Sequence, residues 1–113
     1  MSMSIQTLVE TAFEATMVRV DQHDDNHVEA LVEAVFSALH MNPAGPVQVR
    51  SMEAQAESQL GSGTQICFSD IHNGERFVLA HYAGFIWRIN VKQTFNFHTF
   101  SIWDVVSIWR SEY

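Results

Sequence analysis

Apolar and polar residues alternate in a strand-like pattern over most of the stretch from Thr64 to Phe100. Within it, Asn73-Gly74 is the strongest turn signal, because a two-residue type I′ turn needs a positive φ at both central positions. A hairpin closed by this turn would set Cys67 opposite Ala80, with successive side chains alternating between two faces. One face would hold Ile66, Phe68, Phe77, Leu79 and His81, and the other Cys67, Val78, Ala80 and Tyr82.

A second tight turn is predicted at Ala83-Gly84, followed by the strand with the cleanest alternation in the chain. The next connection is predicted to be a three-residue loop from Lys92 to Thr94, because that length sets Val91 against Phe95 and keeps apolar residues on one face. The apolar side of the strand would hold Phe85, Trp87, Ile89 and Val91, and its polar side Arg88, Asn90 and Lys92.

Helical spacing predicts three helices outside this stretch. The first covers residues 5–20 with Ser4 as its N-cap, and the second begins at an Asn26 or Asp25 cap and ends before Pro43. The third is a C-terminal helix that begins near Ser101. Its apolar stripe would be Ile102, Val105, Val106 and Trp109, with Trp103 and Ile108 beside it.

Residues 47–60 are ambiguous, since a strand over 47–54 is favoured and a short helix fits nearly as well. The elements together predict one α+β domain over residues 1–113. It would contain two N-terminal helices, a mostly antiparallel sheet of four to five strands, and a C-terminal helix.

No apolar run approaches the ~20 residues that a membrane span needs, and the first ten residues lack the layout of a secretory signal. Cys67 is the single cysteine, so no internal disulfide can form. We therefore expect a cytoplasmic protein that does not bind membranes.

The net charge of −7 arises entirely in the first 60 residues. That part contains nine acidic and two basic residues, whereas residues 61–113 contain four of each. This balance argues against direct binding of DNA or RNA, which requires a basic surface, and it favours a partner protein that is basic. Glu10 with Glu14, and Glu29 with Glu33, are like charges four residues apart, which destabilise an isolated helix by about a few tenths of a kcal/mol.

A divalent metal could bind to the cluster of Asp21, His23, Asp24, Asp25 and His27. The cluster matches no ligand-spacing signature, and a solvated acidic loop at a helix N-terminus explains the same residues. We expect no metal site and no cofactor.

Two further groups of residues are candidates for chemistry. Cys67 with His81 or His98 could form a thiol–imidazole pair, but the predicted register places Cys67 and His81 on opposite faces of the sheet. His81, His98, Asp70 and Trp87 could line a small ligand pocket, although aromatic strands with a stray polar residue are the normal content of a small core.

The charge pattern favours a non-enzymatic protein-binding module. Small inhibitors, immunity-like proteins and phage-encoded antagonists of bacterial defence are commonly acidic and lack catalytic motifs, an analogy at the level of class. An acidic helical face would dock on a basic, nucleic-acid-handling protein, and exposed aromatic residues would add buried area. The predicted partner-binding residues are Glu10, Glu14, Asp21, Asp24, Asp25, Glu29, Glu33, Trp103, Trp109 and Tyr113.

Two other functions remain open. The aromatic C-terminal helix has more apolar surface than one contact can cover, so a homodimeric chaperone-like or adaptor protein could associate through it. A small ligand-binding domain or enzyme could instead use the face of His81, His98 and Trp87. This last function ranks lowest, because the sequence contains no clustered nucleophile, base and orienting group.

Overall fold

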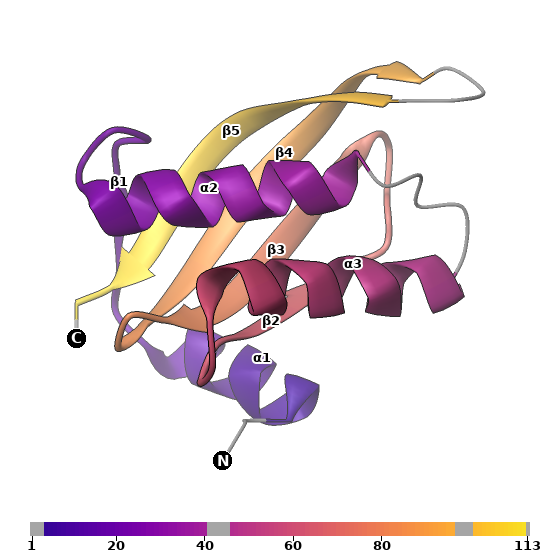
Figure 1. Cartoon of the computed structure of the whole chain (residues 1–113). Helices are drawn as coiled ribbons and strands as arrows, with labels where there is room; N and C mark the ends of the chain where they lie inside the picture. Colours follow the sequence, from indigo (N-terminus) through magenta and orange to yellow (C-terminus); the bar gives the residue numbers. More distant parts are fainter. Residues whose placement is uncertain (1–3, 41–45, 97–100, 113) are drawn as a thin grey trace.

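The computed structural model describes residues 4–40, 46–96 and 101–112. In these residues a five-stranded antiparallel sheet, in the order β1-β5-β4-β3-β2, is combined with three helices (Figure 1). The fold is α+β, but the predicted C-terminal helix is wrong, because four strands follow the last helix. The elements are α1 (Ile5–Glu14), β1 (Met17–Val20), α2 (Asn26–Leu39), α3 (Pro46–Leu60), β2 (Gln65–Phe68), β3 (Glu75–Tyr82), β4 (Phe85–Asn96) and β5 (Ser101–Ser111).

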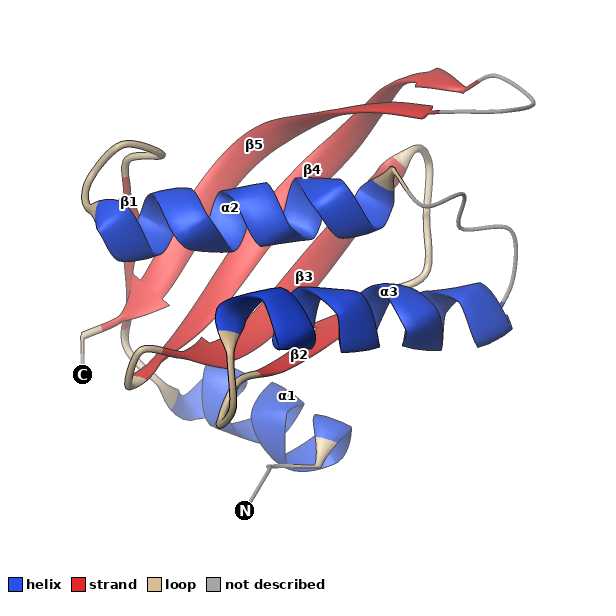
Figure 2. Cartoon of the chain, viewed as in Figure 1, coloured by secondary structure: helices blue, strands red, loops and turns tan. Residues whose placement is uncertain are grey.

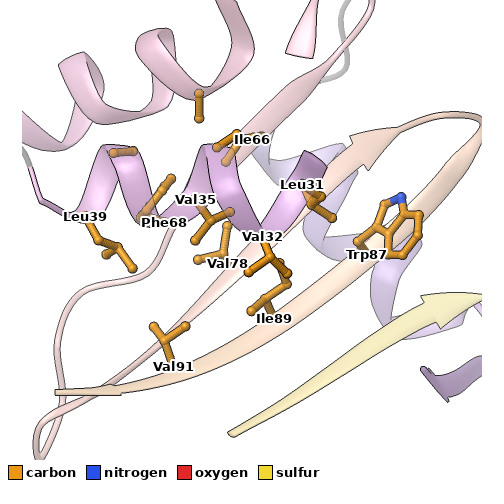
Figure 3. Close-up of a cluster of buried hydrophobic side chains, with 14 of the residues drawn as sticks. Leu31, Val32, Val35, Leu39, Ile66, Phe68, Val78, Trp87, Ile89 and Val91 are labelled. Carbon is orange, nitrogen blue, oxygen red and sulfur yellow. The ribbon is translucent and has the colours of Figure 1, made fainter. Parts of the chain in front are cut away.

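The helices lie on both faces of the sheet. Figure 2 shows α2 and α3 in front of the sheet and α1 behind it. The face under α2 and α3, here the covered face, carries the main core, with side chains from α2 packed on those of β2, β3 and β4 (Figure 3). On the opposite face, here the α1 face, Leu8 packs in a smaller cluster with Cys67, Leu79 and Ile86.

The predicted Ser4 cap is confirmed, and of the two alternatives for the next helix, Asn26 and Asp25, Asp25 is the cap. The Ser4 hydroxyl accepts a hydrogen bond from the Thr7 N–H at 3.1 Å, and the Asp25 carboxylate accepts one from the Val28 N–H at 2.9 Å. The first helix is shorter than predicted and ends at Glu14. Residues 17–20 form β1 instead, because they pair with β5, a partner about ninety residues away that local periodicity cannot reveal.

Residues 46–60 form a helix, so the favoured strand over 47–54 is wrong and the helical alternative is correct. Helix-forming residues dominate this segment, and Pro46 suits the first helical position. The helix lies along the edge strand β2 (Figure 1). Its Glu57 and Glu53 carboxylates accept hydrogen bonds from the Ile66 and Phe68 N–H groups at 2.9 and 2.8 Å. Two outward N–H groups of the edge strand are thereby blocked from pairing with another chain.

The two predicted tight turns are confirmed, with positive φ angles at Asn73 and Ala83 and at the glycine after each. The predicted alternation of β4 is confirmed as well, with Trp87, Ile89 and Val91 buried.

The predicted register of β2 is wrong by one residue, because Cys67 pairs with Leu79 rather than Ala80. An extra residue between Phe68 and His72 causes this shift, which places Cys67 and His81 on the same face.

The predicted loop over 92–94 is also wrong, since β4 continues to Asn96. Beyond the point where β3 ends, β4 still pairs with β5. In β5, Asn90 pairs with Ser107 and Val91 pairs with Val105, so that Val106 is an extra residue in a β-bulge. The bulge places the core-facing Val105 and Ile108 three residues apart, which is the spacing of a helical stripe. This spacing is why the strand resembles a helix in the sequence.

Among the described residues, none of the helices is both long enough and apolar enough to cross a membrane.

Candidate functional site

The acidic residues do not form one continuous face. Glu10 and Glu14 are exposed on α1, behind the sheet, whereas the remaining predicted acidic residues lie on the β1–α2 loop and on α2, in front of it (Figure 1). The sequence could not show this separation, because it depends on which side of the sheet each helix packs. Asp21, Asp24, Asp25, Glu29 and Glu33 are all exposed and are close together along the chain.

Two of these five residues have structural roles. Asp25 caps α2 and forms an ion pair with Arg110 at 3.4 Å, and the hydrogen bond from the Val28 N–H is the main cause that holds the pKa of Asp25 below its usual value. Asp21 accepts a hydrogen bond from the His23 N–H at 2.9 Å. Glu29 lies 3.7 Å from the His23 ring. In the part of the chain that the structure describes, Asp24 and Glu33 form no ion pair.

The metal candidate at the same loop does not assemble. Within residues 4–40, 46–96 and 101–112, no three His, Cys, Asp or Glu side chains lie close enough to hold a metal ion. The two histidines point to different neighbours, since His23 approaches Glu29 and the His27 ring lies edge-on to Tyr82 at 5.8 Å.

The three aromatic residues predicted to bind a partner have different environments. Trp103 is 4% exposed and belongs to the main core. Trp109 is half-buried on the α1 face, and Tyr113 lies outside the described residues. Residues 101–111 form an inner strand between β1 and β4 rather than a helix, with Ile102 40% and Val106 50% exposed. The helical dimer surface therefore does not exist.

His81 and Trp87 lie on opposite faces of the sheet. Trp87 is fully buried on the covered face, where its Nε1–H donates to the Tyr82 carbonyl at 2.8 Å. His81 lies on the α1 face, where it pairs with Ile86 of β4. His98 lies outside the described residues. The histidine–tryptophan pocket considered from the sequence is therefore divided by the sheet.

Cys67 lies on the same face as His81, against the sequence-based expectation, but its environment does not favour a nucleophile. Burial raises the pKa of the Cys67 thiol to about 11, and the negative charge of Glu53 adds to the effect. The thiol is consequently protonated at neutral pH, and a thiolate is the form that attacks.

The α1 face contains a groove that the sequence analysis missed. It lies between α1 and the sheet, has a volume of about 350 Å³, and draws its lining from one helix and four strands. This volume is at the lower end of the roughly 300–1,000 Å³ typical of small-molecule sites. The lining residues are Val9, Ala12 and Phe13 of α1, Met17 of β1, Phe77 and Leu79 of β3, Arg88 and Asn90 of β4, and Trp109 of β5.

A chain of hydrogen bonds fixes the polar side of the groove. The Arg88 Nε–H donates to Asn90 Oδ1 at 3.1 Å, and the Asn90 Nδ2–H donates to Ser107 Oγ at 2.8 Å. The same hydroxyl accepts a hydrogen bond from Trp109 Nε1 at 3.1 Å. The Arg88 guanidinium also lies 4.5 Å from the centre of the Phe77 ring. These contacts hold Arg88 in one orientation.

The sequence indicates only part of this groove. Arg88 and Asn90 are visible as the polar side of a strand, but a polar side normally indicates solvent exposure. The groove forms because α1 packs on that face and β5 brings Trp109 beside Arg88, and both contacts join segments that are distant in the sequence.

Comparisons with protein-family models, with curated proteins and with solved structures gave no match for this chain.

Proposed function

We propose that this protein is a non-enzymatic binding module, an inhibitor or antagonist that docks on a basic surface of another protein. The docking surface is the acidic surface formed by Asp21, Asp24, Glu29 and Glu33. The observation that carries the proposal is that these four exposed carboxylates form no ion pair with a lysine or arginine among the described residues.

Asp21 accepts the His23 N–H and Glu29 lies near the His23 ring, whereas Asp24 and Glu33 form no ion pair or side-chain hydrogen bond among the described residues. Asp25 already caps α2, so the helix does not need a further carboxylate at its start. Glu29 and Glu33 are four residues apart in α2 and repel each other, which is slightly unfavourable for the free protein. A basic partner would remove this repulsion, and the attraction would speed association at low ionic strength.

The separation of the helices provides a matched test. Asp24→Asn with Glu33→Gln removes two charges from the acidic surface, and Glu10→Gln with Glu14→Gln removes two charges from exposed positions on α1, behind the sheet. Each variant changes the net charge by the same amount. Tagged protein of each kind would be incubated with lysate of the source cells at low and high salt, and recovered proteins would be purified and titrated.

We expect the wild type and the α1 variant to bind the same basic protein, with an affinity that falls as salt rises. The Asp24 and Glu33 variant should bind this protein about tenfold more weakly at low salt, because rim charges act mainly through long-range attraction. Equal binding by the two variants would show that general acidity is sufficient, and the proposed surface would then be wrong.

A further inference from the structure

We infer that the groove beside α1 is a binding site for a small aromatic carboxylate, and that Arg88 binds the carboxylate group. This inference goes beyond the proposed function, which uses the other side of the sheet. It rests on the orientation of Arg88, on the absence of an ion-pair partner for Arg88 among the described residues, and on the shape of the groove.

The orientation of Arg88 leaves its charged end available. Its Nε–H is used by Asn90, and one flat side of the guanidinium lies over the Phe77 ring. The two terminal nitrogens form no hydrogen bond within the described part of the chain. A guanidinium with its terminal nitrogens free presents two parallel donors, the arrangement that binds a carboxylate in bidentate geometry.

No described carboxylate neutralises this charge. The ion pairs in residues 4–40, 46–96 and 101–112 are His23 with Glu29 and Arg110 with Asp25, and both lie at the start of α2. Arg88 is half-buried beside apolar side chains. A cation that is partly removed from water interacts more strongly with an anion than one on an open surface.

The walls of the groove determine what accompanies the carboxylate. Val9, Ala12 and Leu79 form an apolar side, and the Trp109 ring lies near the polar network. An inorganic anion would leave these walls in contact with water, whereas an aromatic ring would cover them. The volume of about 350 Å³ suits a ligand of one or two rings rather than an extended peptide.

The test compares 2-naphthylacetate with its neutral analogue 2-naphthylacetamide, using calorimetry and ¹⁵N spectra of the full chain. We expect the acid to bind at least about tenfold more tightly than the amide, because its carboxylate can form a charge-assisted pair with the Arg88 guanidinium. The signals of Arg88 Nε and Trp109 Nε1 should shift with the acid.

Two variants and one control complete the experiment. Asn90→Asp places a carboxylate where the amide oxygen lies 3.1 Å from Arg88 Nε, so it neutralises the guanidinium and keeps the shape of the site. Both Asn90→Asp and Arg88→Gln should abolish the preference for the acid. Arg50→Gln, which removes an exposed arginine from α3, should keep it. Asn90→Asp remains informative even where Arg88→Gln fails to fold.

Equal affinity for acid and amide, or no binding of either at millimolar concentration, would overturn the inference. Retention of the acid preference in Asn90→Asp and Arg88→Gln would overturn the role of Arg88. A tripeptide ending in phenylalanine that binds more tightly than 2-naphthylacetate would show that the groove accepts a chain terminus rather than a small molecule.

Discussion

Arg76 is a charged residue in the main core of the covered face, where it is 5% exposed. Its guanidinium lies 5.9 Å from the Phe68 ring centre and 5.5 Å from that of Trp103. Within the described residues, its Nε and Nη1 atoms are buried without a hydrogen-bond acceptor. Burial lowers the pKa of Arg76, and Asp70 and Glu53 oppose this shift only through their charges. The ring contacts therefore leave part of the desolvation penalty uncompensated.

Arg76→Met should raise the free energy of unfolding by about 1 kcal/mol, because a buried cation with unsatisfied donors is often less stable than an apolar side chain of similar volume. Urea unfolding at pH 7 measures the change. Arg50→Met is the control, since Arg50 is exposed and its replacement should change stability by less than about 0.5 kcal/mol. A loss of stability in Arg76→Met would show that the guanidinium contributes more through its ring contacts than it costs.

The carboxyl group of Glu53 makes the stability of the fold depend on pH. Burial is the main cause that raises the pKa of Glu53, and the nearby Glu57 adds to it, while the hydrogen bond from the Phe68 N–H acts in the opposite direction. A carboxyl group whose pKa is raised by folding stabilises the protein below its unfolded pKa. This contribution is lost as the pH rises through the folded pKa.

Glu53→Gln removes the titration and keeps an oxygen that can accept the Phe68 N–H. The stability of the variant relative to the wild type should rise as the pH increases from 4 to 7. The rise should be less than about 1 kcal/mol, because the Glu53 carboxylate of the wild type is still partly solvated. Urea unfolding at pH 4, 5.5 and 7 gives the difference. Exposed Glu10→Gln serves as the control, and a difference for Glu53→Gln that does not change with pH would contradict the prediction.

At the scale of single elements, caps and tight turns were predicted correctly, whereas the strand favoured over 47–54, the loop over 92–94 and the elements that depend on distant pairing were not. The caps at Ser4 and Asp25 and the turns at Asn73-Gly74 and Ala83-Gly84 depend on neighbouring residues, and all four are confirmed. The strand β1 and the strand β5 depend on each other across the chain, and both were predicted as helix. The groove could not be predicted either, because its lining comes from five elements.

A helix and a bulged strand over residues 101–111 predict opposite burial for Val106 and Ile108. A helix over residues 101–111 would bury Val106 and leave Ile108 off its apolar stripe, whereas the strand leaves Val106 50% exposed and Ile108 2% exposed. Ile108→Ala should therefore lower the free energy of unfolding by about 3 kcal/mol. Val106→Ala should change it by less than about 0.5 kcal/mol.

Chemical denaturation of both variants under the same conditions measures this contrast. Each variant serves as the control for the other, because both remove methyl groups from the same strand. A larger effect at Val106 than at Ile108 would contradict the strand and its bulge.

At the scale of the whole molecule, β5 connects two parts of the sheet, because it lies between β1 and β4. Removal of residues 101–113 should abolish cooperative unfolding, since it removes Trp103 and Ile108 from the core and leaves two strands without their partner. Circular dichroism and light scattering would measure this loss. A chain shortened by residues 112–113 alone should lose less than about 1 kcal/mol.

A folded monomer or a folded dimer of the chain that ends at residue 100 would contradict this prediction. The first outcome would mean that β5 is dispensable for the core. The second would mean that another chain can replace it.

The two proposals use opposite sides of the same sheet and differ in charge. The acidic surface at the start of α2 attracts cations, and the groove beside α1 contains Arg88, which forms no ion pair among the described residues. The net charge of −7 therefore does not describe the groove, whose local charge has the opposite sign. A small anion and a basic protein could bind at the same time without sharing a residue.

The pairing of β1 with β5 also affects how the protein is made. At a synthesis rate of about 5–20 residues per second, β1 leaves the ribosome roughly 5–20 s before β5, the strand with which it pairs. During that interval α2, α3 and the β2–β3 hairpin emerge one after another and can form local contacts. Closure of the sheet is then a late, long-range step, and the growing chain exposes the edge of β4 until β5 emerges.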